Sequence, residues 1–371
     1  MTTSTTSPPA VDEALAVRGL VQHFVARRSW ADRLSGTPAH VVKAVDGVDL
    51  TLHKGETLGL VGESGCGKST LSRCVVGLYE PTAGEIRYGG EVLKGLPTRA
   101  QRRSVQMIFQ DPYSSLNPRM TVGQTLGEIL RYHRLVPRDQ VAVRCRELMD
   151  LVGLPHEALG RAPRQFSGGQ RQRIGIARAL ALVPDVLIAD EPVSALDVSV
   201  QATIINLLLE LKESLGLSMV FVSHNMAVVR QVSDRIAVMY RGRIVETGRT
   251  AAVFDDPQHP YTKLLLGSVP RMLTPVHGSQ IGTADPLAVV DGEPDADESP
   301  FAAHALEGET GCRFRPRCPV SFDRCVVEPG LLAVHRRSAA ASGAALGGQP
   351  AADGGQSAAC WHVEDGMGAR A

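Results

Sequence analysis

The sequence lacks several features that would assign a chain to a class at once. Lysine plus arginine and aspartate plus glutamate are equal at 39 each among 371 residues, so no charge excess points to nucleic acid or to an anionic membrane surface. The longest apolar runs, such as ALALVPDVLIA at 179–189, fall short of the roughly 18 residues that cross a bilayer. The N-terminal segment has no basic stretch followed by an apolar core, so we expect no secretory signal and disorder over residues 1–12.

The sequence also shows no internal repeat and no sign of an oxidising compartment. We expect the chain in the cytosol, where disulfides are disfavoured. Its seven cysteines are therefore expected to be thiols, metal ligands or buried small side chains. The hydrophobic fraction of 43% is ordinary for a globular protein, and the length allows at least one sizeable core.

Apolar segments alternate with helical patterns from about residue 13 to 270. TLGLVG at 57–62, DVLIAD at 185–190 and SMVFVSH at 218–224 are typical of buried strands. Their alternation with helices predicts an α/β fold with a mainly parallel sheet. Residues 121–163 have apolar side chains at three- and four-residue spacing, which predicts a helical insertion between strands.

The composition changes after about residue 270. ADPLAVVDGEPDADES at 284–299 is acidic and contains proline, and SAAASGAALGGQPAADGGQSAA at 338–359 has low complexity. Both segments predict linkers or flexible loops. A compact segment rich in cysteine, arginine and proline lies between them.

The segment GESGCGKST at 62–70 has the spacing of a phosphate-binding loop, and it lies between a strand pattern and a helix pattern. Its glycines let backbone amides surround phosphates, and the helix N-terminus adds positive potential. We expect Lys68 to reach the β- and γ-phosphates of ATP and the Ser69 hydroxyl to bind Mg²⁺. The expected ATP contacts in this loop are Gly62, Glu63, Ser64, Gly65, Cys66, Gly67, Lys68, Ser69 and Thr70.

A second acidic motif, VLIADE at 186–191, ends an apolar strand. We expect the strand to deliver Asp190 to the Mg²⁺ shell. Glu191 is expected to orient and polarise the attacking water. A buried strand that merely ends in two acids is the alternative, and the phosphate loop argues against it.

A third motif, QFSGGQRQRIGIARALAL at 165–182, places Ser167, Gly168 and Gly169 ahead of a helix. Serine is a favourable N-cap, and the glycines let a phosphate approach the free amides of the first turn. A capped helix start with a solvated basic face would have the same local pattern. The motif lies 24 residues before Glu191.

Together these motifs resemble the nucleotide-binding subunits of ATP-binding cassette (ABC) transporters over about residues 13–270. The resemblance implies a P-loop NTPase fold with a RecA-like α/β core and a helical subdomain at about 121–165. It also implies that the SGGQ signature, Ser167 to Gln170, touches the γ-phosphate of ATP held by the phosphate loop of a partner subunit.

The resemblance assigns roles to residues elsewhere in the cassette. Gln110 in QMIFQDP would sense Mg²⁺ and water in a loop that faces the membrane subunits, His224 in FVSHN would hold the γ-phosphate, and Asp197 in SALD would lie at the dimer contact. Phe24 in VQHF is the candidate for the aromatic side chain that stacks on adenine. Asn225 follows His224 where many members have Asp, and we expect hydrolysis to persist. The expected catalytic residues are Glu191, His224 and Gln110, and the expected Mg²⁺ ligands are Ser69, Gln110 and Asp190.

A narrower resemblance is to the subfamily that serves oligopeptide and dipeptide importers. It depends on QDPYSSLNPRMTVGQTLGE, ADEPVSALDVSVQA and DDPQHPYTKLLLGSVP, and on a C-terminal extension, here residues 271–371, with GCRFRPRCP-like and ACW-like segments. It implies an ATP-hydrolysing subunit of a peptide importer at the cytoplasmic face of the cell membrane. Its partners would be two transmembrane permease subunits, a second nucleotide-binding subunit that is identical or different, and an extracytoplasmic peptide-binding protein.

Two other functions remain open. Relatives of this type also import other small solutes such as nickel, and soluble cassette ATPases act on DNA or the ribosome. The neutral charge, the single cassette and the absence of a long coiled-coil insertion favour the transporter and argue against nucleic acid as a partner.

Four cysteines near the C-terminus have the ligand count of a structural zinc site or an iron–sulfur cluster. They are Cys312, Cys318, Cys325 and Cys360, and all four match the extension of the subfamily. Their spacing is looser than in zinc knuckles, and Pro319 follows Cys318 as proline often follows a cluster ligand, so we favour 4Fe–4S over zinc. Unliganded thiols, a disulfide pair and a redox-sensing tail remain alternatives.

Overall fold

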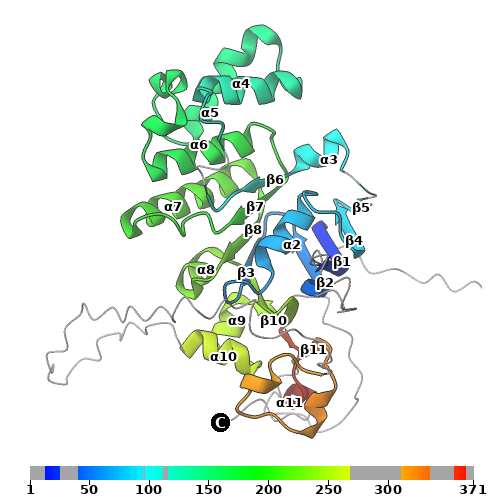
Figure 1. Ribbon diagram of the computed structural model, residues 1–371. Coiled ribbons are helices and arrows are strands. Elements are labelled where there is room, and N and C mark those ends of the chain that lie inside the picture. The colour runs from blue at the N-terminus through cyan, green and yellow to red at the C-terminus, as the bar shows by residue number, and fades with distance from the viewer. Residues whose placement is uncertain are drawn as a thin grey trace, which may run out of the picture.

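The computed structural model describes residues 13–25, 41–93, 95, 97–111, 116–267, 311–334 and 355–364. The predicted disordered N-terminus and the acidic linker lie outside these residues. Figure 1 shows the described chain with a helical region at one end and the C-terminal extension at the other.

The larger sheet is built mainly from the strands expected around the phosphate loop. β3 pairs in parallel with β8 and β9, and β7 pairs in parallel with β6 and β8. In spatial order, the strands among the described residues are β11 (Leu332–Ala333), β12 (Ser357–Ala358), β10 (Arg243–Arg249), β9 (Arg235–Tyr240), β3 (Thr57–Val61), β8 (Ser218–Ser223), β7 (Val186–Asp190) and β6 (Val105–Ile108). The predicted α/β fold with a mainly parallel sheet is confirmed.

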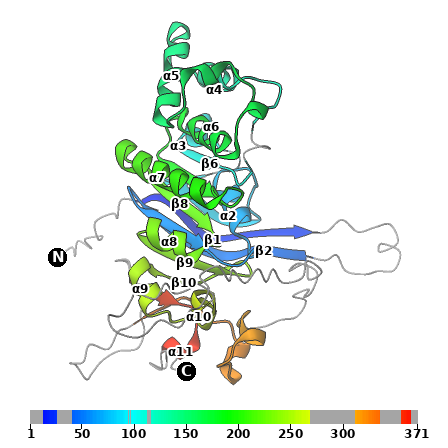
Figure 2. The same cartoon turned by 90° about the vertical axis from the view of Figure 1, so that its left-hand side faces the viewer.

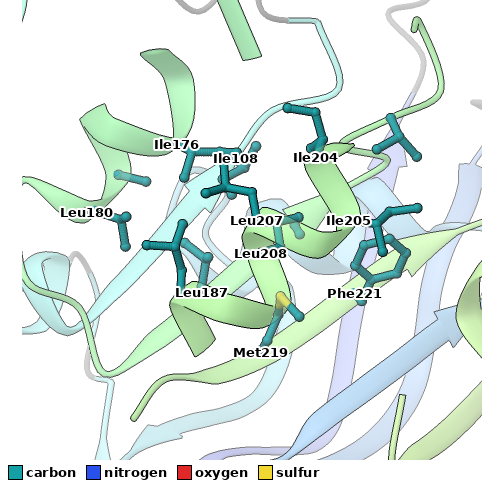
Figure 3. Packing of buried hydrophobic residues seen from close by; sticks show 14 of the residues in the cluster. Ile108, Ile176, Leu180, Leu187, Ile204, Ile205, Leu207, Leu208, Met219 and Phe221 are labelled. Carbon is teal, nitrogen blue, oxygen red and sulfur yellow. The ribbon is translucent and has the colours of Figure 1, made fainter. Parts of the chain in front are cut away.

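Alternate residues of the central strands enter two different hydrophobic clusters. Met219 and Phe221 of β8 pack among Ile204, Leu207 and Leu208 of α7 (Val198–Leu215), as Figure 3 shows. The neighbouring β8 residues, at 220 and 222, belong to the cluster on the other face. This alternation follows from the two-residue period of a strand, and it explains why both faces of the sheet are covered.

The opposite cluster is closed by α2 (Lys68–Val75) and a smaller antiparallel sheet. The strands of this sheet, in spatial order, are β2 (Val41–His53), β1 (Glu13–Val25), β4 (Ala83–Tyr88) and β5 (Glu91–Val92). Leu15, Val17 and Leu20 of β1 are fully buried there together with Leu71 of α2. This packing fixes the helix that begins at the phosphate loop.

The expected helical insertion forms the end of the molecule opposite the extension (Figures 1 and 2). Its elements are α4 (Val122–Tyr132), η1 (Arg138–Gln140), α5 (Val141–Leu151), η2 (His156–Gly160) and η3 (Pro163–Gln165), and α6 (Gly168–Leu180) follows beyond its predicted end. Thr121 and Ser167 each accept a hydrogen bond from the backbone of the third residue of the following helix, and that residue's glutamine side chain accepts one in return. Such capping boxes satisfy amides that have no partner within the helix.

Short helices complete the described chain. They are α3 (Arg99–Ser104), α8 (Met226–Val232), α9 (Thr250–Asp255), α10 (Pro260–Gly267), η4 (Arg315–Arg317), η5 (Asp323–Val326) and α11 (Trp361–Glu364). Among the described helices, none combines the length and the apolar character that a membrane span requires.

The C-terminal extension continues the larger sheet. Ser357 and Ala358 of β12 pair with Thr247 and Glu246 of β10, and β11 pairs with the free side of β12. The prediction of a linker through residues 338–359 is therefore wrong at its C-terminal end. A two-residue strand has no hydrophobic period of its own, and its extended form here depends on the edge that β10 offers.

Candidate nucleotide-binding site

The loop between β3 and α2 has the backbone that a phosphate cradle needs. Gly62 and Gly67 have φ values of 154° and 111°, in the region that favours glycine. A Cβ atom at Gly62 would lie 2.1 Å from the Met239 carbonyl oxygen, and one at Gly67 would lie 2.1 Å from the Ala44 carbonyl oxygen. The loop is therefore enclosed from behind by neighbouring backbone, so glycine is required at both positions.

Lys68 is buried at the start of α2, and its ammonium group is held inside the loop. Its Nζ donates to the carbonyl oxygens of Gly62 at 2.7 Å and Glu63 at 3.0 Å. A charged amine in this position needs further oxygen acceptors, because burial without them is costly. Phosphate oxygens of a nucleotide are such acceptors.

Ser69 and Asp190 meet as expected for Mg²⁺ ligands. The Ser69 hydroxyl donates to Asp190 Oδ1 at 3.1 Å, and the Asp190 side chain is almost completely buried at the end of β7. Burial raises the pKa of this carboxyl, partly offset by the Ser69 hydrogen bond. A buried carboxylate with one hydroxyl partner fits a divalent cation, which would satisfy its remaining charge.

Two of the predicted catalytic residues, Gln110 and His224, contact the carboxylate of the third, Glu191. Gln110 Nε2 donates to Glu191 Oε2 at 3.1 Å, and His224 Nδ1 lies 3.3 Å from Glu191 Oε1. The hydrogen bond from His224 lowers the pKa of Glu191 against the opposing effect of burial, and the same bond raises the pKa of His224. Both shifts favour the charged forms of the two side chains.

Asn225, which stands where many members of the resembled family have Asp, has a structural role. Asn225 is the N-cap of α8, and its Oδ1 accepts hydrogen bonds from the amides of Ala227 and Val228 at 3.0 and 3.3 Å. Asparagine and aspartate are equally good N-caps, so the helix that follows His224 keeps its start.

The signature lies at the start of α6, against the start of α7. The Ser167 hydroxyl accepts from the Gln170 amide at 3.3 Å. A Cβ atom at Gly169 would lie 2.5 Å from Val200 Cγ1, so only glycine allows this contact between the helices. Asp197 is the exposed N-cap of α7 and makes no side-chain capping bond.

Phe24 is the predicted adenine contact. It lies on β1 with 37% of its surface exposed, and its ring makes an edge-on contact with Tyr79 at 5.5 Å between centroids. Tyr79 follows α2, so the two rings connect the smaller sheet with the helix of the phosphate loop.

Several residues that shape the site escape the local sequence patterns. The Glu63 amide donates to the Tyr261 hydroxyl at 2.9 Å, although the two residues are 198 positions apart. Arg317 forms two hydrogen bonds with the Glu63 carboxylate, over 254 positions. No motif spans such separations, so only the fold reveals these contacts.

The four C-terminal cysteines line one small cavity, together with residues of α10 and α11. All four are free thiols, and burial raises the pKa of the Cys312, Cys318 and Cys360 thiols, that of Cys360 to about 11. In the part of the chain that the structure describes, no group of three or more His, Cys, Asp or Glu side chains is arranged to hold a metal ion. The predicted 4Fe–4S cluster, and zinc as its alternative, therefore find no support in the geometry.

The buried lysine, the paired serine and aspartate, and the strand-end glutamate define a P-loop ATPase. The sequence model described as "ABC transporter" matches residues 45–194, and the one described as "Oligopeptide/dipeptide transporter, C-terminal region" matches residues 245–325. The chain belongs to the ABC transporter ATPase family, among the members that carry this C-terminal region.

Curated relatives and solved structures agree with this assignment. The chain is 46% identical to the oligopeptide transport ATP-binding protein OppF of Escherichia coli over 78% of this chain and 84% of the relative. It is 49% identical to OppF of Bacillus subtilis over 70% and 83%. Among structures, cbiO1 from Clostridium perfringens has a TM-score of 0.55 and 26% identity over 66% of this chain and 92% of that one. The cassette MJ0796, solved as a dimer with ADP and phosphate, has the same TM-score and identity over 64% and 98%.

Proposed function

We propose that this chain is the ATP-hydrolysing subunit of a membrane importer for dipeptides and oligopeptides. The observation that carries the proposal is the combination of a complete set of cassette motifs with a C-terminal region of the oligopeptide/dipeptide type. The C-terminal extension is part of the fold, because its strands β11 and β12 extend the larger sheet. Relatives named as oligopeptide transport ATP-binding proteins support the substrate class.

The proposed chemistry is in-line attack of water on the γ-phosphate. Lys68 and the loop amides bind the β- and γ-phosphates and stabilise developing charge, while Ser69, Asp190 and Gln110 would hold Mg²⁺, which would neutralise phosphate charge. Glu191 accepts a hydrogen bond from the attacking water and polarises it. His224, whose Nδ1 lies 3.3 Å from Glu191 Oε1, is proposed to contact the γ-phosphate.

The signature is proposed to act in a partner subunit. Ser167 and Gln170 form an N-terminal capping box, and the remaining amides of the first turn of α6 are proposed to bind a phosphate. The exposed side chain of Asp197 lies at the same surface, which supports its role at the dimer contact. Phe24 is proposed to stack on adenine through its exposed ring face.

The location and the partners follow from the proposed transport. The chain would lie on the cytoplasmic face of the membrane and bind two permease subunits, with a second nucleotide-binding subunit that is identical or different. A peptide-binding protein outside the membrane would deliver the substrate.

Isolation of the complex from detergent-solubilised membranes tests this proposal. We expect the tagged chain to co-purify with two hydrophobic permease subunits and to hydrolyse ATP faster when peptide-loaded binding protein is added. Stimulation by a nickel-loaded binding protein instead would overturn the peptide assignment, and fractionation with ribosomes or DNA would overturn transport.

We retain a metal group at the four cysteines as a separate proposal that rests on their number, because four thiols line one cavity although they are not arranged as a ligand group in the described residues. Elemental analysis of anaerobically purified protein tests it. Iron and inorganic sulfide, with the visible absorption of an iron–sulfur cluster, are the expected result. Zinc without iron would reject the cluster. If neither metal is found, the four cysteines are structural thiols.

A further inference from the structure

The cysteine segment of the extension lies directly against the phosphate loop. The turn η4, which lies between Cys312 and Cys318, ends in Arg317. The Nη1 and Nη2 groups of Arg317 donate to Oε2 and Oε1 of Glu63, each at 3.0 Å. This two-point geometry matches the planar guanidinium to the carboxylate and fixes the orientation of both groups.

Glu63 is held at each of its polar groups. Its carboxylate accepts from Arg317, its amide donates to the Tyr261 hydroxyl at 2.9 Å, and its carbonyl oxygen accepts from Lys68 Nζ at 3.0 Å. The position of Glu63 is therefore linked to the ammonium group that binds the nucleotide phosphates. A shift of Glu63 would move the start of the loop and one acceptor of Lys68 together.

The turn that carries Arg317 has its own anchor in the cassette. Phe314 is fully buried, with ring centroids 5.3 Å from Tyr240, 5.6 Å from Tyr261 and 5.8 Å from His259. The neighbouring Arg313 binds the Asp46 carboxylate and the Arg241 carbonyl oxygen. Because the base of the turn is fixed in this way, Arg317 reaches Glu63 from a rigid support.

We propose that Arg317 is a positioning residue for ATP binding, which holds Glu63, and through it the phosphate loop, in its binding conformation. This inference rests on the proposed ATPase function and extends the site to the C-terminal extension. It assigns the extension a direct role in nucleotide affinity. Both members of the pair keep about two-fifths of their side-chain surface exposed, at 43% and 40%, so salt should weaken the effect.

Steady-state ATP hydrolysis by the full-length chain tests the proposal. Arg317→Ala should raise the KM for ATP about two- to fivefold, the factor expected from a partly exposed ion pair, with kcat close to the wild-type value. Arg317→Lys should give an intermediate KM, because an ammonium group cannot reproduce the two-point contact. In 0.5 M salt, where the Debye length falls to roughly half its physiological value, the difference should shrink.

Glu63→Gln distinguishes the effect of positioning on the KM for ATP from the effect of removing a negative charge. Removal of a negative charge beside the phosphate site would by itself strengthen ATP binding, whereas loss of the ion pair should raise the KM as Arg317→Ala does. The double variant should show no further increase, because both changes remove the same interaction. A lowered KM in Glu63→Gln, or additive effects in the double variant, would overturn the proposal.

Arg315→Ala is the matched control. Arg315 has the same charge and lies in the same exposed turn, and the described part of the chain offers its side chain no ion pair. An equal KM increase in Arg315→Ala would show that only net charge matters. Thermal melting of each variant checks that folding is unchanged. A wild-type chain without ATPase activity would reject the proposed function, whereas an active wild type with an unaffected Arg317→Ala variant would reject only this inference.

Discussion

At the residue scale, Glu191 combines strain with two side-chain partners. Its φ of 44° is left-handed, which costs about 1–3 kcal/mol at a residue other than glycine. Its amide donates to the Val222 carbonyl oxygen, and its own carbonyl accepts from the Ser194 hydroxyl, so the surroundings hold this conformation. The strain orients a carboxylate that Gln110 and His224 both reach.

Glu191→Gln should nearly abolish turnover and leave ATP bound. The amide keeps the size of the side chain but cannot accept a proton from water, and such groups contribute about 10²–10⁴-fold to rates. Phosphate release and equilibrium binding of a fluorescent ATP analogue measure the two effects. Glu213→Gln, an exposed change on α7, is the control. Normal hydrolysis in Glu191→Gln would reject Glu191 as the base.

His259, whose ring lies 5.8 Å from that of Phe314 in the extension, should make the stability of the protein dependent on pH. Burial lowers its pKa to about 3, and its Nδ1 accepts from the Tyr261 amide at 3.1 Å. Because the unfolded chain takes up this proton near pH 6.5 and the folded chain does not, stability should fall as pH decreases below about 6.5. The buried Glu246, whose pKa is raised by burial, has the opposite sign, since its stabilisation is lost as pH rises through that raised pKa.

The comparison of wild type with His259→Asn isolates this effect, because both proteins keep Glu246. Asparagine offers an acceptor oxygen but does not titrate, so its melting temperature should change less between pH 7.5 and pH 5.5, about one pH unit either side of the histidine value. Equal changes in the two proteins would assign the pH dependence to other groups.

At the element scale, the sequence predicts the strands and helices that have a pattern of their own. The runs before Gly62 and through Asp190 form β3 and β7, and the insertion forms α4 and α5. These elements are long enough for a hydrophobic period to show. β11 and β12 have two residues each and take their conformation from a neighbouring strand, so no sequence pattern could predict them.

The contact between α6 and α7 predicts a sharp effect of Gly169→Ala. The new methyl group would lie 2.5 Å from Val200 Cγ1, so the start of α6 must move away from α7. A displacement of this order should lower kcat by about tenfold to a hundredfold, while nucleotide still binds to the phosphate loop of the same chain. Steady-state hydrolysis and nucleotide binding measure both.

The double variant Gly169→Ala with Val200→Ala provides the control. Removal of the Val200 methyl groups makes room for the new Cβ, so activity should recover toward that of Val200→Ala alone. A double variant as inactive as Gly169→Ala would show that the loss does not come from this clash.

At the scale of the whole molecule, the extension is attached by packing and by strand pairing. A segment of this size buries little core of its own, and a cluster bound by its four cysteines would be one means of tying it down. The structure instead shows Phe314 buried among cassette residues and β12 paired with β10. In the candidate site, the motif residues can be predicted from the sequence. The contacts of Tyr261 and Arg317 cannot, because they join distant chain segments that only the fold brings together.

Phe314→Ala should destabilise the folded protein by about 3–5 kcal/mol, as expected for a buried phenylalanine. Phe314→Leu fills part of the space and should lose less. Urea unfolding measures the difference, and limited proteolysis of residues 311–334 should be faster in the alanine variant. An unchanged unfolding midpoint would show that the aromatic contacts contribute nothing to the attachment.

The late position of β12 in the chain has a consequence for protein synthesis. Gln356, next to β12, bonds to Glu246 of β10 across 110 residues of sequence. The ribosome therefore makes β10 long before the strand that covers its edge, and an unpaired edge can join another chain. A nascent chain stalled in this interval would hold a nearly complete cassette with an open sheet, so messages truncated there should yield aggregates instead of a smaller ATPase.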